Sequence, residues 1–471
     1  MSLNSYDGVP NGGRPPGSAR GSILDAVLAA TMPVVSRGRL RSLVAWTWFP
    51  HAVLFAVALV LRVSWVLAVD RKGFAFNDAL MYHSTAENLS RGRGYVPFTG
   101  GPTARWPPGF STVLGGLYSL FGVHPVVGEL FNAVVGALTV VLLMLIAERT
   151  LDRGTAIVAG AMLAVLPGPI MWTDVLVSET LYTAVFVAAV LVLVSARPTW
   201  GWLLAFGVAV GVGALVRGEA LTWLALPVAM WWRLVPWREL GRIVLVAVST
   251  AAVVMLPWTV RNAVVMDAFV PVATNASETL WSGHNEHATG AQIYPPADYD
   301  DRFDQTLPAL ELQRSKALRN DAIEYMVTHP LRELELVPLK LVHLNRGDSY
   351  VLDWVNAPGE GEAPPISAIQ AERIGVVADF GYYALLTLTV LGGVVLGRRF
   401  WGSPIGRIAG TSFAMALFLY GFLYYGNYRY RSPYEPLMAL VAAAFVTRAF
   451  RGRELLADGL QNRGESADND A

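Results

Sequence analysis

Two acidic side chains stand beside long apolar stretches of this sequence, in positions where a carboxylate could do chemistry. Asp78 lies in FNDALMYHSTAENLS, and Glu179 lies in WTDVLVSETLYT. A carboxylate that reaches a hydroxyl group can take its proton as a general base. Both residues could also have a purely structural role, because Asp78 falls near a predicted helix N-cap and a negative charge favours the start of the helix at Glu179. Asp174 is the neighbouring candidate for the second acid.

Several arginines lie at the ends of apolar stretches and could bind an anionic group. The candidates for holding a phosphate are Arg105, Arg217, Arg429 and Arg431. A planar guanidinium group binds two phosphate oxygens at once and stays charged. Structural roles are also compatible with two of them, because Arg105 and Trp106 could anchor the chain at a membrane interface and Arg217 could simply pair with Glu219. Arg62 lies inside the first apolar stretch, where it either reaches outward or helps to hold a phosphate.

Other polar residues near these motifs are candidates for contacting a substrate: Tyr82, His83, Glu219, His284 and Asn285. Tyr82 lies one helical turn after Asp78, on the same face. His284 and His287 have a spacing that metal ligands can show, but histidines in a loop more often form hydrogen bonds. The chain has no cysteine, which excludes a thiolate metal site. We assign no certain cofactor; a divalent metal ion is compatible with the sequence, but nothing in it supports one.

The elements that carry these residues are predicted to be membrane-spanning helices. Of the 471 residues, 54% are hydrophobic and only 15% are charged, whereas soluble proteins average about 25% charged residues. Mean hydropathy is +0.43. A helix needs about 20 largely apolar residues to cross a bilayer. Ten segments approach this length: Phe49–Val69, Val126–Glu148, Gly154–Thr173, Glu179–Ser195, Gly201–Val216, Ala220–Leu234, Ile243–Val260, Val376–Leu396, Ile408–Tyr425 and Pro436–Phe450.

Arginines in the short loops predict how these spans are oriented. If the leader that carries Arg37, Arg39 and Arg41 is cytoplasmic, ten spans place the later short-loop arginine clusters on the cytoplasmic side as well. The formal net charge of zero gives no general attraction to nucleic acid. Two long segments, 70–125 and 261–375, are then extracytoplasmic loops, and loops of such length are usually functional.

The predicted organisation has three parts. They are a disordered cytoplasmic segment (1–45), a transmembrane domain (46–452) and a cytoplasmic tail (453–471). Within the two long loops, the apolar stretches Pro107–Gly122 and Leu331–Leu344 are predicted to be juxtamembrane helices at the interface or halves of a re-entrant pair, because counting either one alone as a span would invert the arginine pattern.

The order of these parts resembles the GT-C superfamily of integral membrane glycosyltransferases. A first span is followed by Asp78, a helix ending in Gly-Tyr, Arg105 before a Pro-Pro turn, and an apolar helix ending in Leu-Phe-Gly. WSGHNEHATG and YGNYRYRSPYEP add to the likeness. The closest similarity is to the protein mannosyltransferase and aminoarabinose transferase branch (glycosyltransferase family 39-like), roughly from Phe49 to Phe450. The chain departs from it where Ala follows Asp78 instead of an acid, and where Arg105 stands in place of a frequent lysine.

The resemblance implies an all-α polytopic membrane protein, with a GT-C-type helix bundle and juxtamembrane helices in its extracytoplasmic loops. It implies transfer of a sugar from a polyprenyl-phosphate donor to an acceptor hydroxyl on a glycan, lipid or protein, at the outer face of the cell membrane. In that branch the first-loop acid is the catalytic base, which corresponds to Asp78, and Glu179 matches a second acid. The arginines would stabilise the departing phosphate. Direct displacement with a single base inverts the anomeric centre.

A transporter or polyprenyl-lipid flippase is the main alternative from another class. Transporters place ionisable groups and broken helices near the bilayer midplane, often within internal repeats. The predicted spans are almost free of charge at their centres, and the sequence shows no internal repeat. Pro167-Gly168-Pro169 could mark a broken helix in the third span, but it lies near the outer end of that span and not at its centre. A membrane scaffold would not need acids and arginines gathered at the outer ends of separate spans. The pattern therefore favours an active site at the membrane interface.

Overall fold

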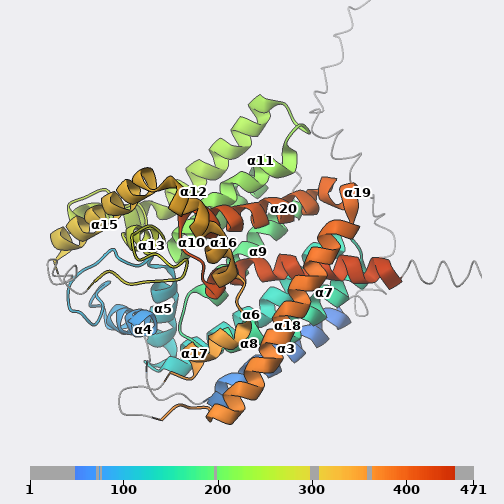
Figure 1. The fold of residues 1–471 in the computed structure, drawn as a ribbon, viewed down its shortest axis with the longest axis horizontal. Coiled ribbons are helices and arrows are strands. Elements are labelled where there is room, and N and C mark those ends of the chain that lie inside the picture. Colours follow the sequence, from blue (N-terminus) through green and yellow to red (C-terminus); the bar gives the residue numbers. More distant parts are fainter. Residues whose placement is uncertain are drawn as a thin grey trace, which may run out of the picture. The chain divides into compact units, whose positions relative to one another are not determined.

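The structure is a computed structural model, and it describes residues 48–69, 74, 77–195, 199–296, 307–357 and 363–450. The predicted cytoplasmic segment 1–45 and the predicted tail 453–471 lie outside these residues. In the described part the chain consists of helices joined by loops and contains no strand (Figure 1), so the prediction of an all-α fold is confirmed.

Five helices are long and apolar enough to cross a membrane. They are α3 (Phe49–Val69), α6 (Pro125–Thr150), α12 (Trp237–Met266), α18 (Ala368–Val395) and Pro404–Leu423, which joins α20 (Pro404–Leu417) to a π-helical turn, η5 (Phe418–Leu423). A sixth span is obtained if α7 (Arg153–Val165) and the bent segment Pro167–Asp174 count as one. Shorter helices cover other predicted spans: α9 (Glu179–Ser195), α10 (Trp200–Val216) and the helix 435–450. The total of ten spans stays a prediction.

Two predicted spans are not continuous α-helices. Pro167 starts α8 (Pro167–Met171), and the segment turns by 55° after α7. The predicted span Ala220–Leu234 is instead a 3-10 helix, η3 (Gly218–Leu224), followed by the seven-residue helix α11 (Ala225–Trp231), which contains Pro227. Proline has no N–H to donate to the carbonyl four residues earlier, so it interrupts a regular helix. The hydropathy pattern did not reveal either break.

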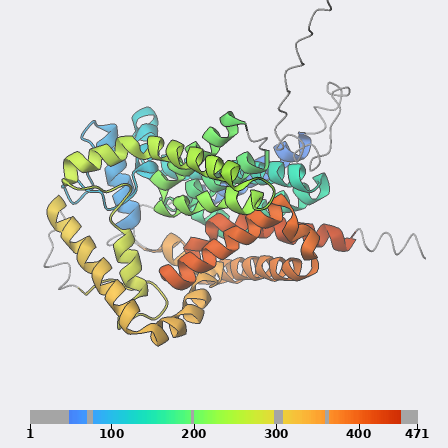
Figure 2. The same ribbon diagram turned by 90° about the horizontal axis from the view of Figure 1, so that it is seen from above.

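The two long loops contain short helices, including those predicted from Pro107–Gly122 and Leu331–Leu344. The helices are α4 (Asn77–Ser90), α5 (Gly109–Phe121), α13 (Ala276–Gly283), α15 (Pro308–Thr328), α16 (Pro330–Leu344), η4 (Asp348–Tyr350) and α17 (Val351–Val355). Figures 1 and 2 show α4, α5, α13 and α15 gathered at one end of the helix bundle. The chain ends its described part with α19 (Gly397–Gly402), the turn η6 (Tyr428–Tyr434) and the helix 435–450.

Close helix packing fixes α9, which begins at Glu179, and α10, which leads to Arg217. On α9, Phe186 and Val190 are fully buried. On α10, a Cβ added at Gly207 or Gly211 would come within 3 Å of atoms of α12, so these glycines let the two helices approach closely. Because α9 is held on several sides, the direction of its first residue, Glu179, is set by the core of the bundle.

Candidate functional site

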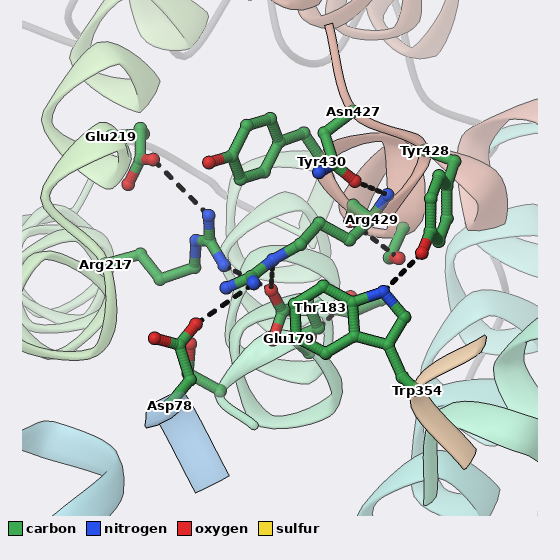
Figure 3. A network of polar contacts seen from close by, with 12 residues as sticks. Asp78, Glu179, Thr183, Arg217, Glu219, Trp354, Asn427, Tyr428, Arg429 and Tyr430 are labelled. Atoms are coloured by element: carbon green, nitrogen blue, oxygen red, sulfur yellow. Dashed lines mark hydrogen bonds and ion pairs between the residues drawn. The ribbon is translucent and has the colours of Figure 1, made fainter. Parts of the chain in front are cut away.

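Three charged residues from distant parts of the chain meet at one point. Asp78 lies in the first turn of α4, Glu179 is the first residue of α9, and Arg429 lies in η6. Arg429 Nη1 is 3.0 Å from Asp78 Oδ2, and Arg429 Nε is 2.7 Å from Glu179 Oε1. Figure 3 shows the Arg429 guanidinium group between the two carboxylates. One arginine therefore joins the two acids that the sequence singled out.

A second arginine extends this arrangement into a chain of alternating charges. Arg217, which ends α10, places Nη1 at 2.6 Å from Glu179 Oε1 and Nη2 at 3.5 Å from Glu219 Oε1. Arg217 and Arg429 thus share one oxygen of Glu179 (Figure 3). The order of charges is Asp78, Arg429, Glu179, Arg217, Glu219, and each negative group contacts a positive one. We call these five residues the charge chain.

The side chains of the two acids, Asp78 and Glu179, differ in their exposure to solvent. The Glu179 side chain is 2% exposed, whereas the Asp78 side chain is 27% exposed. Burial alone would lower the pKa of Arg429, but the nearby carboxylates of Glu179 and Asp78 outweigh it and raise that pKa well above its usual value. Arg429 is consequently a permanent positive charge, and Asp78 is the acid of this pair that a substrate can reach.

The turn that carries Arg429 is held by backbone contacts and by its own cap. The side chain of Asn427 accepts a hydrogen bond from the backbone N–H of Arg429, at 3.1 Å. A Cβ on Gly426 would collide with the carbonyl oxygen of Lys340 in α16, so only glycine fits there. The N–H of Gly426 donates to the carbonyl of Gly290 at 2.9 Å. The long second loop therefore helps to position Arg429.

Aromatic side chains that the sequence prediction missed surround the Arg429 guanidinium group. Its central carbon lies 5.1 Å from the ring centre of Trp354 and 5.7 Å from that of Tyr430. The indole N–H of Trp354 donates to the hydroxyl of Tyr428 (Figure 3). Such rings attract a cation through their negative faces. Trp354 lies outside every motif, and Tyr428, although part of YGNYRYRSPYEP, was not singled out, because both meet Arg429 only in the folded chain.

Arg431 does not join the charge chain, although it lies two residues from Arg429. It contacts Asp348, donates through Nε to Glu435 Oε1 at 3.0 Å, and lies 3.6 Å from the ring centre of Tyr382. Its side chain is only 5% exposed. Arg431 is thus held by two carboxylates and a ring, away from the surface that Asp78 presents.

Arg105 also lies apart from the charge chain, in a second polar cluster. Its Nη2 is 2.7 Å from Glu278 Oε2, and Arg314 contacts the same oxygen at 2.9 Å. The guanidinium group of Arg105 also lies 4.6 Å from the ring centre of Trp106. The carboxylates of Asp78 and Glu278 add to the effect of burial in raising the pKa of Tyr294, while Arg429 and Arg105 oppose it.

The residues predicted to contact a substrate are divided between several places. Glu219 belongs to the charge chain. Tyr82 is buried on α4, and its hydroxyl lies 3.5 Å from Ser178 Oγ; burial, aided by Asp78 and Glu179, raises its pKa and keeps the phenol protonated. His83 Nδ1 lies 2.8 Å from the hydroxyl of Tyr118.

His284 and Asn285 lie in the contacts between the second loop and the turn before Arg429. His284 Nδ1 is 2.7 Å from Glu333 Oε2, and its Nε2 is 3.0 Å from the carbonyl oxygen of Leu423 and 3.3 Å from Lys340 Nζ. The amide of Asn285 donates to the Trp281 carbonyl at 2.7 Å. These contacts indicate that His284 and Asn285 support the loop.

The Arg62 side chain points into the bundle and donates hydrogen bonds to backbone carbonyl groups beside the break at Pro167. It donates to the carbonyl oxygens of Ala164 at 3.1 Å and Leu163 at 3.4 Å, and the residue is 1% exposed. Pro167 cannot donate to the Leu163 carbonyl, so a distant side chain does so instead. Of the two roles predicted for Arg62, outward reach is excluded by this burial.

A divalent metal ion has no evident protein site here. Among the residues that the structure describes, no group of three or more His, Asp or Glu side chains is arranged to hold one. The acids Asp78 and Glu179 are each joined to Arg429 instead. The hypothesis that His284 and His287 bind a metal also finds no support, because the His287 ring contacts Glu286 and is 70% exposed.

The described helices have a fold similar to that of the GT-C membrane glycosyltransferases. It matches the archaeal oligosaccharyltransferase AglB from Archaeoglobus fulgidus, in complex with an inhibitory peptide and a dolichol-phosphate. The TM-score is 0.54 at 14% identity, covering 88% of this chain and 52% of that chain. The apo form of the A. fulgidus enzyme gives 0.54 at 15% identity, covering 89% and 53%. The chain spans about half the length of these proteins.

A family model adds sequence evidence. The model described as dolichyl-phosphate-mannose-protein mannosyltransferase matches residues 105–260, which are 156 of the 471 residues. ArnT from Cupriavidus metallidurans, bound to undecaprenyl phosphate, matches at TM-score 0.39 with 17% identity, covering 87% of this chain and 79% of that chain; at that score it adds nothing to the fold assignment. No curated protein sequence matches significantly. The resemblance to the GT-C superfamily is confirmed.

Proposed function

We propose that this protein is a membrane glycosyltransferase that moves a sugar from a polyprenyl-phosphate donor to an acceptor hydroxyl, at the extracytoplasmic face of the cell membrane. The observation that carries the proposal is the meeting of Asp78, Glu179 and Arg429, which come from α4, α9 and η6. The GT-C fold supports it, and so does the dolichol-phosphate in the AglB complex that shares this fold.

Asp78 is the general base in this proposal. The acceptor hydroxyl must lose a proton as its oxygen attacks the anomeric carbon, and a carboxylate opposite the leaving group can accept that proton. Asp78 is the more exposed acid of the pair, and Arg429 orients its carboxylate through a 3.0 Å contact. Glu179 is too buried to meet a sugar directly, so it acts by holding both Arg429 and Arg217 in place.

Arg429 is the arginine best placed to stabilise the leaving phosphate. It is fixed beside the base, and fixed positive charge stabilises the negative charge that develops on the leaving group. Arg105, which pairs with Glu278 in the second cluster, provides a second positive charge for the donor in this proposal. Arg431 is committed to Asp348 and Glu435, which leaves it a supporting role.

The test is sugar transfer by the purified full chain in lipid nanodiscs, supplied with labelled polyprenyl-phosphate hexoses and pentoses and with glycan, lipid and peptide acceptors. Asp78→Asn should lower kcat by about 10²–10⁴ fold, the contribution typical of a general base. Glu87→Gln is the matched control, because Glu87 lies on the same helix and pairs with Arg91 at 2.8 Å.

Analysis of the product by NMR should show an inverted anomeric centre. Equal turnover by the wild type and Asp78→Asn would remove Asp78 from the mechanism. Movement of the labelled lipid across the bilayer without sugar transfer would replace the enzyme by a flippase.

A further inference from the structure

A small cavity lined by charged side chains lies behind Glu179, inside the helix bundle. Its volume is about 30 Å³, which is room for about two water molecules. Arg62 from α3, Glu179 from α9 and Glu435 at the start of the last helix all line it, and Thr180 and Thr183 contribute to its wall. The cavity therefore borders the charge chain at Glu179.

Each of the three charged residues leaves one atom without a protein partner. Glu179 gives Oε1 to both arginines, and its Oε2 is buried without a hydrogen bond within the described ranges. Glu435 gives Oε1 to Arg431, and its Oε2 is likewise buried and unbonded, as is Nε of Arg62. All three residues are at most 2% exposed. A buried polar atom left unbonded is costly, so these atoms need a ligand that both donates and accepts.

Water fits the cavity better than an ion. A cation would meet the guanidinium group of Arg62, and an anion would meet the carboxylates of Glu179 and Glu435. Water can accept from Arg62 Nε and donate to Glu179 Oε2, and buried waters typically make about three such bonds.

The negative charge of the carboxylates near Glu435 favours a proton on one of them. Arg431 faces two carboxylates, Asp348 and Glu435, and Asp379 also acts on Asp348. Burial and this neighbouring charge raise the pKa of Asp348, although Arg431 opposes the shift. Burial and the nearby charge of Asp348 likewise raise the pKa of Glu435, to about 8, although Arg431 opposes the shift; of these two carboxyl groups, Glu435 is the one that lines the cavity.

We propose that the cavity holds about two ordered waters and that Glu435 is protonated there, donating through water to Glu179 Oε2. Glu435 is then a positioning residue for Glu179, because the water bond keeps Oε1 of Glu179 turned toward Arg217 and Arg429. This catalytic consequence rests on the proposed function, whereas the waters and the proton do not.

The first test uses the unaltered chain. A cryo-electron microscopy map of the protein in nanodiscs, at a resolution that shows ordered water, should contain density in contact with Arg62 Nε, Glu179 Oε2 and Glu435 Oε2. An empty cavity, or density too strong for water at this position, would overturn the proposal without any variant having to fold.

The second test measures thermal unfolding between pH 5 and 8. A carboxyl group that keeps its proton only in the folded state makes stability fall as pH rises above its ordinary pKa, near ~4.3, toward its raised folded value. Glu435→Gln, which cannot ionise, should remove a slope of about 1–2 °C per pH unit. Glu87→Gln should keep that slope. An unchanged slope in Glu435→Gln would show that Glu435 is not the proton carrier.

The third measurement links the cavity to transfer. Glu435→Gln can still donate to water, whereas Glu435→Leu cannot, so kcat should be about tenfold lower in Glu435→Leu than in Glu435→Gln. Equal kcat values would refute the positioning role. The unfolding and density measurements need no turnover, so a failure of the proposed function is distinguishable from a failure of the buried proton.

Discussion

Arg429 joins the two acids of the candidate site, and its replacement by methionine tests the arrangement most directly. The change removes a contact of 3.0 Å to Asp78 and one of 2.7 Å to Glu179, while keeping a side chain of similar length. Glu179 is 2% exposed and would keep only Arg217, at 2.6 Å, as a charged partner among the described residues. The variant therefore leaves a partly uncompensated charge in the bundle.

The expected cost follows from the burial of these groups. Breaking a buried ion pair by removing one partner typically costs about 3–5 kcal/mol. Because Arg217 still balances Glu179 and Asp78 is partly exposed, we expect the lower end, about 3 kcal/mol, for Arg429→Met. In a chain of this length that corresponds to a decrease in Tm of roughly 3 °C. Transfer should fall by about 10²–10³ fold, the loss typical when one stabilising donor is removed.

A double-mutant cycle separates the ion pair from simple loss of packing. Adding Glu179→Gln to Arg429→Met removes the unbalanced carboxylate, so the double variant should recover at least about 1 kcal/mol of stability. Arg149→Met is the control, because Arg149 is exposed and donates to a carbonyl of its own helix. The reasoning is refuted if Arg429→Met unfolds and transfers sugar like the wild type, or if the two changes are strictly additive.

Three further changes test other parts of the structure. Burial lowers the pKa of Lys340 to about 8, so the folded state binds this proton more weakly than the unfolded state does. The free energy of unfolding should therefore rise with pH from about 8 to 10.5. Lys340→Met should abolish that rise and add roughly 3 kcal/mol at pH 7, as measured by thermal unfolding. Gly426→Ala should lower both Tm and transfer, because its Cβ would collide with the Lys340 carbonyl oxygen. Arg62→Met should cost about 2 kcal/mol in denaturant unfolding by orphaning the carbonyls of Leu163 and Ala164, and wild-type stability would contradict that role.

The sequence predicted the class of fold because apolar length is a local property. Each long apolar run is helical, and the helix start at Asn77 and Asp78 was recognisable from its residues alone. Pro167-Gly168-Pro169 marked a possible broken helix, and the structure has a bend there. The 3-10 helix Gly218–Leu224 was not predicted, because hydropathy treats that run as continuous. What satisfies the carbonyl freed by Pro167, here Arg62, is visible only in the folded chain.

The candidate site was predicted in its residue types but not in all its pairings. Asp78, Glu179 and Arg429 meet as expected, and Arg217 with Glu219 joins them. Arg429 and Arg431, both in YGNYRYRSPYEP, could not be distinguished from the motif, because most of their partners are distant in sequence. Alternate residues of a tight turn point in different directions, so Arg429 faces the first loop.

Arg431, two residues on, faces the opposite way. It meets Asp348 and Glu435, which carried no motif of their own. Trp354 and Tyr428 were missed for the same reason, since an aromatic residue in a loop gains its role only from the cation that the fold places beside it.

The geometry of the charge chain links donor binding to release of the base. Arg429 contacts Asp78 through Nη1 and Glu179 through Nε, so these two nitrogens are both occupied. A donor phosphate that takes the Nη1 side must displace the Asp78 carboxylate, which is the weaker-held and more exposed of the two acids. The contact with Glu179 can remain, since it uses a different nitrogen and a buried oxygen. In the proposed reaction, binding of the donor phosphate to Arg429 Nη1 thus releases the Asp78 carboxylate, which can then contact the acceptor hydroxyl. Asp78 becomes available as a base only when the donor is bound.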